Sequence, residues 1–252
     1  MAIILKTAEQ IRLMKEAGRI TGEAILKARD VIRPGVSTWE VDRVIHDYIV
    51  KCGAKPSFLG YAGFPGSACV SVNSEVIHGI PSRKRILEEG DLVKVDVGAL
   101  YRGYHGDSAK TFAVGRVTPE AERLIERTRE CFYRGVAKAV AGNRIGDVGH
   151  AVQTCAEEAG FSVVREYVGH GVGSQLHEEP NVPNYGTEGR GCRLYAGMTI
   201  AIEPMVNAGG AGVRVLPDGW TVVTSDGRLS AHYEHTVAVT DDGPVLLTDV
   251  GE

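Results

Sequence analysis

The sequence has few cysteines, few aromatic residues and no long hydrophobic run. Its five cysteines are odd in number and include no CxxC pair, which argues against a disulfide framework and against a cysteine-bound zinc site. No apolar stretch approaches the ~20 residues needed to cross a bilayer, and the apolar run at residues 3–5 is too short for a signal peptide. These absences predict a protein of the reducing cytoplasm that has no membrane partner.

The sequence also has no excess of positively charged residues. The chain has 28 Lys+Arg against 32 Asp+Glu, a formal net charge of −4, so no general basic field is available to hold nucleic acid. Of its 252 residues 43% are hydrophobic and 24% are charged, which is typical of a globular protein with a substantial core. We therefore expect a folded domain and no nucleic-acid partner.

Two capping-box patterns mark the first helices. The runs Thr-Ala-Glu-Gln and Ser-Thr-Trp-Glu begin at Thr7 and Ser37, and each lets a hydroxyl and a side chain three residues later satisfy free backbone amides. A proline at residue 119 suits the first position of a third helix. Four helices are expected, over about residues 7–33, 37–52, 118–141 and 147–159.

The remaining segments are short β-branched runs broken by glycine, which predict strands. We expect these strands near residues 68–72, 91–97, 104–114, 198–203, 220–224 and 232–240. The order helix, helix, strands occurs twice, and GDLVKVD at residues 90–96 aligns without a gap with GMTIAIE at residues 197–203. The sequence therefore predicts one domain made of two related α/β halves, about 1–115 and 116–252.

Carboxylates end the repeated strands. A two-residue hairpin turn at residues 101–102 would place Asp96 opposite Asp107 on one face of a sheet, with Cβ atoms ~4.5–5.5 Å apart. The internal repeat adds Glu203 and Glu234 to this pair. Four converging carboxylates carry more negative charge than one neighbouring lysine can neutralise, so metal ions are the simplest explanation.

A nitrogen ligand is then expected, and His170 is the best candidate. It lies in the run Val-Gly-His-Gly-Val-Gly, where glycines allow close backbone approach and would carry the imidazole on a tight turn. An oxygen-rich shell with one imidazole favours Mn(II), Fe(II), Co(II) or Zn(II). Four carboxylates can bridge two such ions ~3.5–4 Å apart, as in two-metal hydrolases, so the pattern predicts hydrolysis.

The settings of these residues resemble a known family. KVDVG around Asp96, HGD at Asp107, GHG at His170, IEPM at Glu203 and YEHT at Glu234 look like the five metal-ligand motifs of the methionine aminopeptidases, peptidase family M24. The resemblance extends nearly end to end and is to the minimal bacterial type I form. It implies the "pita-bread" fold, an α/β domain over residues 1–252 with pseudo-two-fold symmetry, an antiparallel central sheet and helices outside.

The resemblance also implies roles for the acidic residues and His170. Asp96 would chelate one of two divalent metals, His170 and Glu203 would chelate the other, and Asp107 and Glu234 would bridge them. Glu203 is the expected proton shuttle.

Further roles follow for two histidines and an apolar pocket. His177 would hydrogen-bond the scissile carbonyl, and His78 would lie beside the scissile amide. A monovalent cation is expected near Asn73 and Ser230. The residues expected to line the methionine pocket are Tyr61, Phe64, Cys69, Leu176 and Trp220, with Phe58 nearby.

The function implied is removal of the initiator methionine from nascent proteins with a small second residue, by a monomer that contacts the ribosome transiently. Two alternatives remain. A proline-specific aminopeptidase shares the catalytic fold but carries an additional N-terminal domain, for which His78 comes too early in the chain. A pita-bread protein without activity would serve as a binding module, but the presence of all five ligands and both histidines argues against it.

Overall fold

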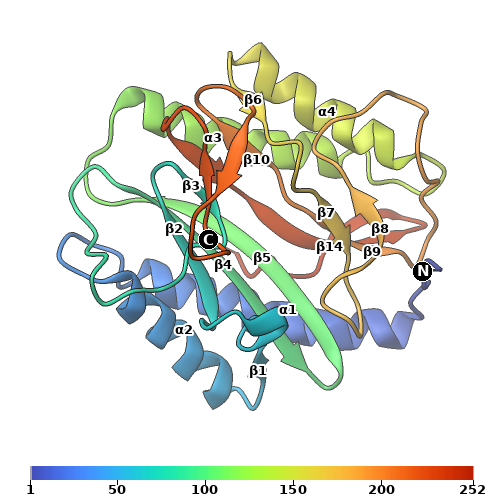
Figure 1. Cartoon of the computed structure of the whole chain (residues 1–252). Coiled ribbons are helices and arrows are strands. Elements are labelled where there is room, and N and C mark those ends of the chain that lie inside the picture. The colour runs from blue at the N-terminus through green and yellow to red at the C-terminus, as the bar shows by residue number, and fades with distance from the viewer. Residues whose placement is uncertain (1, 252) are drawn as a thin grey trace.

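The computed structural model describes residues 2–251 (Figure 1). Both predicted capping boxes form, at Thr7 and Ser37. The third helix ends five residues earlier than expected, because the chain tightens after Val136 into short-range turns that continue to Val140. The helices are α1 (Ala8–Arg29), α2 (Thr38–Lys51), α3 (Pro119–Val136) and α4 (Ile145–Glu158).

Strands fill the rest of the fold, and every predicted strand is present. The segment expected as one strand over 232–240 is divided at Tyr233, and its two parts belong to different sheets. The strands are β1 (Lys55–Pro56), β2 (Ala68–Val72), β3 (Glu75–Ile77), β4 (Leu92–Tyr101), β5 (Tyr104–Ala113), β6 (Ser162–Val163), β7 (Gly169–Gly171), β8 (Glu178–Val182), β9 (Thr199–Ile202), β10 (Met205–Asn207), β11 (Val213–Val215), β12 (Val222–Thr224), β13 (Ser230–His232), β14 (Glu234–Thr240) and β15 (Gly243–Leu246).

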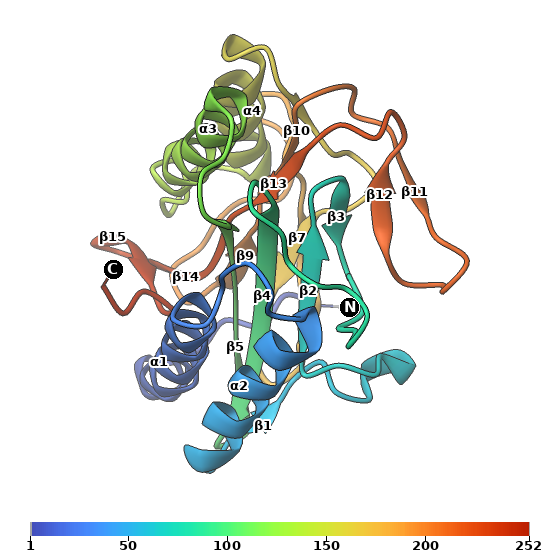
Figure 2. The same ribbon diagram turned by 90° about the vertical axis from the view of Figure 1, so that its left-hand side faces the viewer.

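The two halves of the chain share one antiparallel sheet. Its strands follow the order β1-β4-β5-β14-β9-β7-β8, with β2 beside β4 and β15 beside β14. The halves join where β5 pairs with β14, with Ala109 opposite Glu234 and Ser108 opposite His235. In Figure 2, α1, α3 and α4 lie to one side of these strands and β12 and β11 lie to the other. The predicted class, α/β with an antiparallel sheet and helices outside, is confirmed.

The register of the β4–β5 hairpin differs from the prediction. Tyr101 pairs with Tyr104, so the turn residues are Arg102 and Gly103, with φ of 50° and 84°. Positive φ at both positions is what a two-residue turn requires here, and glycine meets this demand at little cost. Asp96 consequently pairs with Ala109 rather than with Asp107. The expected direct pairing of the two carboxylates is wrong, and they are diagonal neighbours across the hairpin.

The hydrophobic core lies between the sheet and the helices. One cluster joins α1 and α2 to β2 and β4, and another joins α3 and α4 to β9 and β14. A Cβ added to Gly106 would lie 2.7 Å from the Cα of Gly18, so glycines allow α1 to cross β5 closely. Within residues 2–251, no helix has the length and apolar character needed to span a membrane.

Candidate active site

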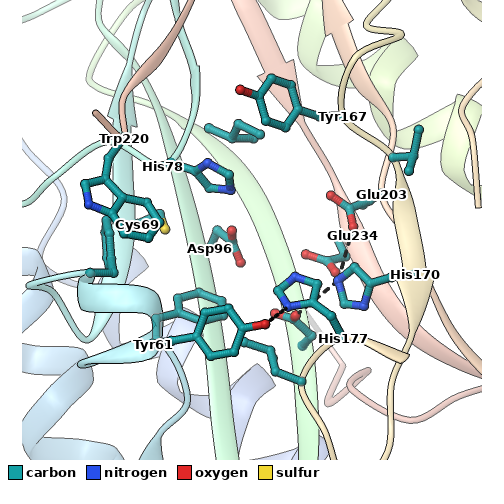
Figure 3. Close-up of a pocket in the computed structure, with 16 residues that line it drawn as sticks. Tyr61, Cys69, His78, Asp96, Tyr167, His170, His177, Glu203, Trp220 and Glu234 are labelled. Atoms are coloured by element: carbon teal, nitrogen blue, oxygen red, sulfur yellow. Dashed lines mark hydrogen bonds and ion pairs between the residues drawn. The ribbon is translucent and has the colours of Figure 1, made fainter. Parts of the chain in front are cut away.

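A cavity of about 190 Å³ opens between the two halves (Figure 3). It brings together all of the expected metal ligands, both expected catalytic histidines and every residue expected in the methionine pocket. The residues that line it are Phe58, Tyr61, Phe64, Cys69, Ile77, His78, Asp96, Asp107, Tyr167, Val168, His170, Leu176, His177, Glu203, Trp220 and Glu234.

Five polar groups converge from five strands or strand ends. Asp107 on β5, His170 on β7 and Glu234 on β14 each offer one ligand atom, and these three atoms lie within 4.8 Å of one another. The Nε2 atom of His170 lies 3.5 Å from Oε1 of Glu203, which follows β9, and 3.8 Å from Oδ2 of Asp107. Asp96 on β4 faces the same space in Figure 3. Asp107, His170 and Glu234 are therefore close enough together to hold one metal ion.

The surroundings of these carboxyl groups disfavour their ionised forms when no cation is bound. Burial, together with repulsion from the neighbouring carboxylates, raises the pKa values of Asp96, Glu203 and Glu234 well above their usual range. Burial also raises the pKa of Asp107 to about 7. Oδ1 of Asp96 and Oδ1 of Asp107 are buried and have no hydrogen-bond partner among the described residues. Among residues 2–251, those that line the cavity include no lysine and no arginine. The donor set therefore fits divalent cations, which favour oxygen and imidazole ligands.

His170 is held in the form that a metal ligand requires. Its Nδ1 lies 2.9 Å from the carbonyl oxygen of Gly171, and because a carbonyl only accepts, Nδ1 carries the proton and Nε2 keeps a lone pair. Burial lowers its pKa to about 3, so the ring is neutral. The expected tight turn is wrong, because His170 lies in strand β7. The expected close approach is present: a Cβ on Gly169 or Gly171 would lie 2.3 Å from a backbone oxygen.

Two further histidines face the cavity. His78 has a φ of 59°, a left-handed conformation that costs energy outside glycine and is often found at functional sites. Its ring makes edge contacts with Tyr167 and Trp220, and burial lowers its pKa to about 4. His177 has its Nδ1 2.8 Å from the hydroxyl of Tyr61, and desolvation lowers its pKa. Both imidazoles are therefore neutral hydrogen-bonding groups at neutral pH.

The remaining wall of the cavity is apolar. Phe58, Phe64, Cys69 and Leu176 form a buried cluster against which Trp220 packs, and the rings of Phe64 and Trp220 meet edge to face at 5.1 Å. Burial and the nearby carboxylates raise the pKa of the Cys69 thiol, so it stays protonated. An unbranched side chain could enter between these groups.

Sequence reasoning missed four residues at the site. Ile77, Tyr167 and Val168 line the cavity, and only their proximity to His78 and His170 in the chain could have indicated them. Nε2 of the buried His232 lies 3.8 Å from Oε2 of Glu203, and neither of its ring nitrogens has a hydrogen-bond partner within the described chain. Its position two residues before the ligand candidate Glu234 was the available signal.

Comparison with known proteins finds metallopeptidases that match nearly the whole chain. A model of metallopeptidase family M24 matches residues 12–241. The methionine aminopeptidase of Clostridium acetobutylicum is 52% identical over 246 residues, which are 98% of this chain and 98% of that protein. The crystal structure of methionine aminopeptidase from Thermotoga maritima has a TM-score of 0.97 at 46% identity and covers 98% of this chain and 100% of that one. Prolidase from Pyrococcus furiosus has a TM-score of 0.80 at 27% identity, over 99% of this chain and 66% of that one. The expected pita-bread fold is confirmed.

The raised carboxyl pKa values predict that Mn(II) stabilises the metal-free protein more at pH 7.5 than at pH 5. A carboxyl whose folded pKa lies above its unfolded value of about 3.9 contributes stability below that value. For Asp107 this contribution is lost as the pH rises through about 7. A cation replaces the protons most easily where they are already weakly held. The measurement is the shift in thermal midpoint on adding Mn(II) at each pH.

The control for this experiment is Asp107→Asn, which removes one ligand and should shrink the Mn(II) shift at both pH values. Equal shifts for the wild-type protein at pH 5 and pH 7.5 would contradict the prediction.

Proposed function

Because the chain belongs to metallopeptidase family M24, we propose that it is an aminopeptidase that removes N-terminal methionine from peptides and nascent proteins. The observation that carries this proposal is the convergence of four buried or partly buried carboxyl groups and His170 beside a small apolar pocket. The full-length similarity to methionine aminopeptidases supports the same substrate.

The proposed metal ligands are Asp96, Asp107, His170, Glu203 and Glu234, which would hold two divalent ions of Mn, Fe, Co or Zn. When bound, the ions would supply an acidified water and polarise the substrate carbonyl. The partnerless oxygens of Asp96 and Asp107 support this assignment, since a buried carboxylate without any partner is costly.

The protein's own groups have three proposed tasks. Glu203 has a 12% exposed side chain and would carry a proton to the leaving amine. His177 would donate from Nε2 to the scissile carbonyl, a role supported by the Tyr61 hydroxyl that lies at its Nδ1. His78 would hydrogen-bond the scissile amide from the opposite wall.

The methionine side chain would lie among the apolar wall residues. A thioether gains from contact with aromatic rings, and Phe64 and Trp220 present such rings. A cavity of about 190 Å³ leaves little room for a second large side chain, which supports a preference for a small residue after methionine.

We further propose that residues 1–252 act as one monomeric metallopeptidase domain in the cytoplasm, with transient ribosome contact. The sheet shared by both halves supports a single unit. A proline-specific peptidase is disfavoured because similarity to prolidase is much lower than to methionine aminopeptidases. A binding module without activity is disfavoured because the ligand set is intact.

The proposed activity predicts that Met-Ala peptides lose their methionine at least tenfold faster, by kcat/KM, than Met-Leu peptides. A tenfold ratio corresponds to about 1.4 kcal/mol of crowding in the transition state. The measurement is release of free methionine by the metal-loaded protein, with an N-acetylated peptide as control, since it lacks the free amine. Equal rates for both peptides, or cleavage of the acetylated one, would contradict the proposal.

The role of His177 predicts that His177→Ala lowers kcat by about 10²–10³ with a smaller change in KM, as when one oxyanion donor is removed. The matched control is His150→Ala on α4, outside the cavity, which should leave kcat unchanged. A rise in KM at constant kcat would contradict this role, because it would show that His177 binds the ground state and the transition state equally well.

A further inference from the structure

A buried lysine lies where the resemblance to the methionine aminopeptidases implies a monovalent cation. The side chain of Lys94 on β4 is almost fully buried, and its Nζ donates a 2.7 Å hydrogen bond to the carbonyl oxygen of Asn73. The backbone N–H of Ser230 donates to the same oxygen at 3.1 Å. A carbonyl oxygen has two lone pairs, so both acceptor positions of this oxygen are in use.

The other polar side-chain atoms at this place are engaged as well. Oδ1 of Asn73 accepts from the N–H of Leu92 at 2.9 Å, and its Nδ2 donates to Asp91 at 2.7 Å. The hydroxyl of Ser230 donates to the carbonyl of Val206 at 3.2 Å. A free K⁺ or Na⁺ at the Asn73 carbonyl would have to displace the amine of Lys94, so Asn73 and Ser230 do not fit an independent monovalent-cation site beside this side chain.

Two nearby acidic side chains nevertheless favour a positive charge at this place. Burial lowers the pKa of Lys94 to about 7, and the carboxylates of Glu75 and Asp91 oppose this shift because they favour the charged form of the amine. Each carboxylate is also anchored to the backbone, Glu75 by the N–H of Val72 and Asp91 by the N–H of Glu88. An ammonium group is a compact cation with three donors, and it resembles K⁺ in charge while being tied to the chain.

We propose that the ammonium of Lys94 takes the place of a monovalent cation at Asn73 and Ser230, so that this protein needs no K⁺ or Na⁺ there.

The position of the Lys94 amine shows which segments of the chain it would stabilise. Asn73 lies between β2 and β3, and β3 leads directly to His78. Ser230 begins β13, which leads to Glu234 on β14. The hydrogen bonds at the Asn73 carbonyl therefore connect a segment of the first half that carries His78 to a segment of the second half that carries Glu234. Lys94 is a positioning residue for both sides of the cavity.

The test compares thermal unfolding midpoints in KCl, NaCl and tetramethylammonium chloride at equal ionic strength. The wild-type midpoint should be the same in all three salts, because the place of the cation is filled. Lys94→Ala removes the ammonium and leaves space, so its midpoint should fall by roughly 5 °C or more in tetramethylammonium chloride. It should recover saturably in KCl or NaCl, and methionine release should recover with it.

Lys94→Met is the matched control, since it fills a similar volume without charge and should be destabilised equally in all three salts. Saturable stabilisation of the wild-type protein by K⁺ or Na⁺ would overturn the proposal. So would a Lys94→Ala midpoint that is equal to wild type, or one that falls and is not restored by either cation. If Lys94→Ala does not fold, a salt-independent wild type with a destabilised Lys94→Met supports the proposal, and a Lys94→Met protein as stable as wild type contradicts it.

Discussion

Buried negative charge without a matching cationic side chain is the constraint on which this structure depends. Asp96, Asp107, Glu203 and Glu234 line one cavity, and its described lining includes neither lysine nor arginine. Burying even one unpaired carboxylate is expensive, and a group of four raises the cost through repulsion. The raised pKa values are the consequence in the absence of metal. Divalent cations held by the same group would compensate this charge.

The shared sheet holds these carboxyl groups at a fixed spacing. The pairing of β5 with β14 joins two halves, each of which contributes carboxylates from similar strand positions. The helices close the outer side of the sheet with an apolar core, so the polar groups face inward from rigid strands. Sites built on strands keep side chains in place better than sites built on loops. The two flanking histidines, by contrast, come from segments beside the strands, where they can meet a substrate.

Local sequence patterns predicted many of the helices and strands. The capping boxes at Thr7 and Ser37 and the strands around Asp96 and Glu203 depend on a few neighbouring residues, and they form as expected. The hairpin register failed because it depends on which two residues adopt positive φ, and a shift of one turn position moved Asp96 away from Asp107. The setting of Lys94 could not be predicted, because its partner Asn73 meets it only after β2 and β4 pair. The positions of Tyr167 in the cavity wall and of His232 beside Glu203 were missed, because only their nearness in the chain to His170 and Glu234 hinted at them.

The metal dependence of the carboxylate site is tested most directly by methionine release from a Met-Gly-Met-Met peptide, measured with the metal-stripped protein before and after titration with Mn(II) or Co(II). Without metal we expect no release; with added metal we expect restored release that saturates, and none from Asp107→Ala under the same conditions. Full activity of the stripped protein, or of Asp107→Ala, would contradict the claim that the buried carboxylates act by holding metal. A folded protein that binds the peptide but releases no methionine with any metal would contradict the proposed activity itself.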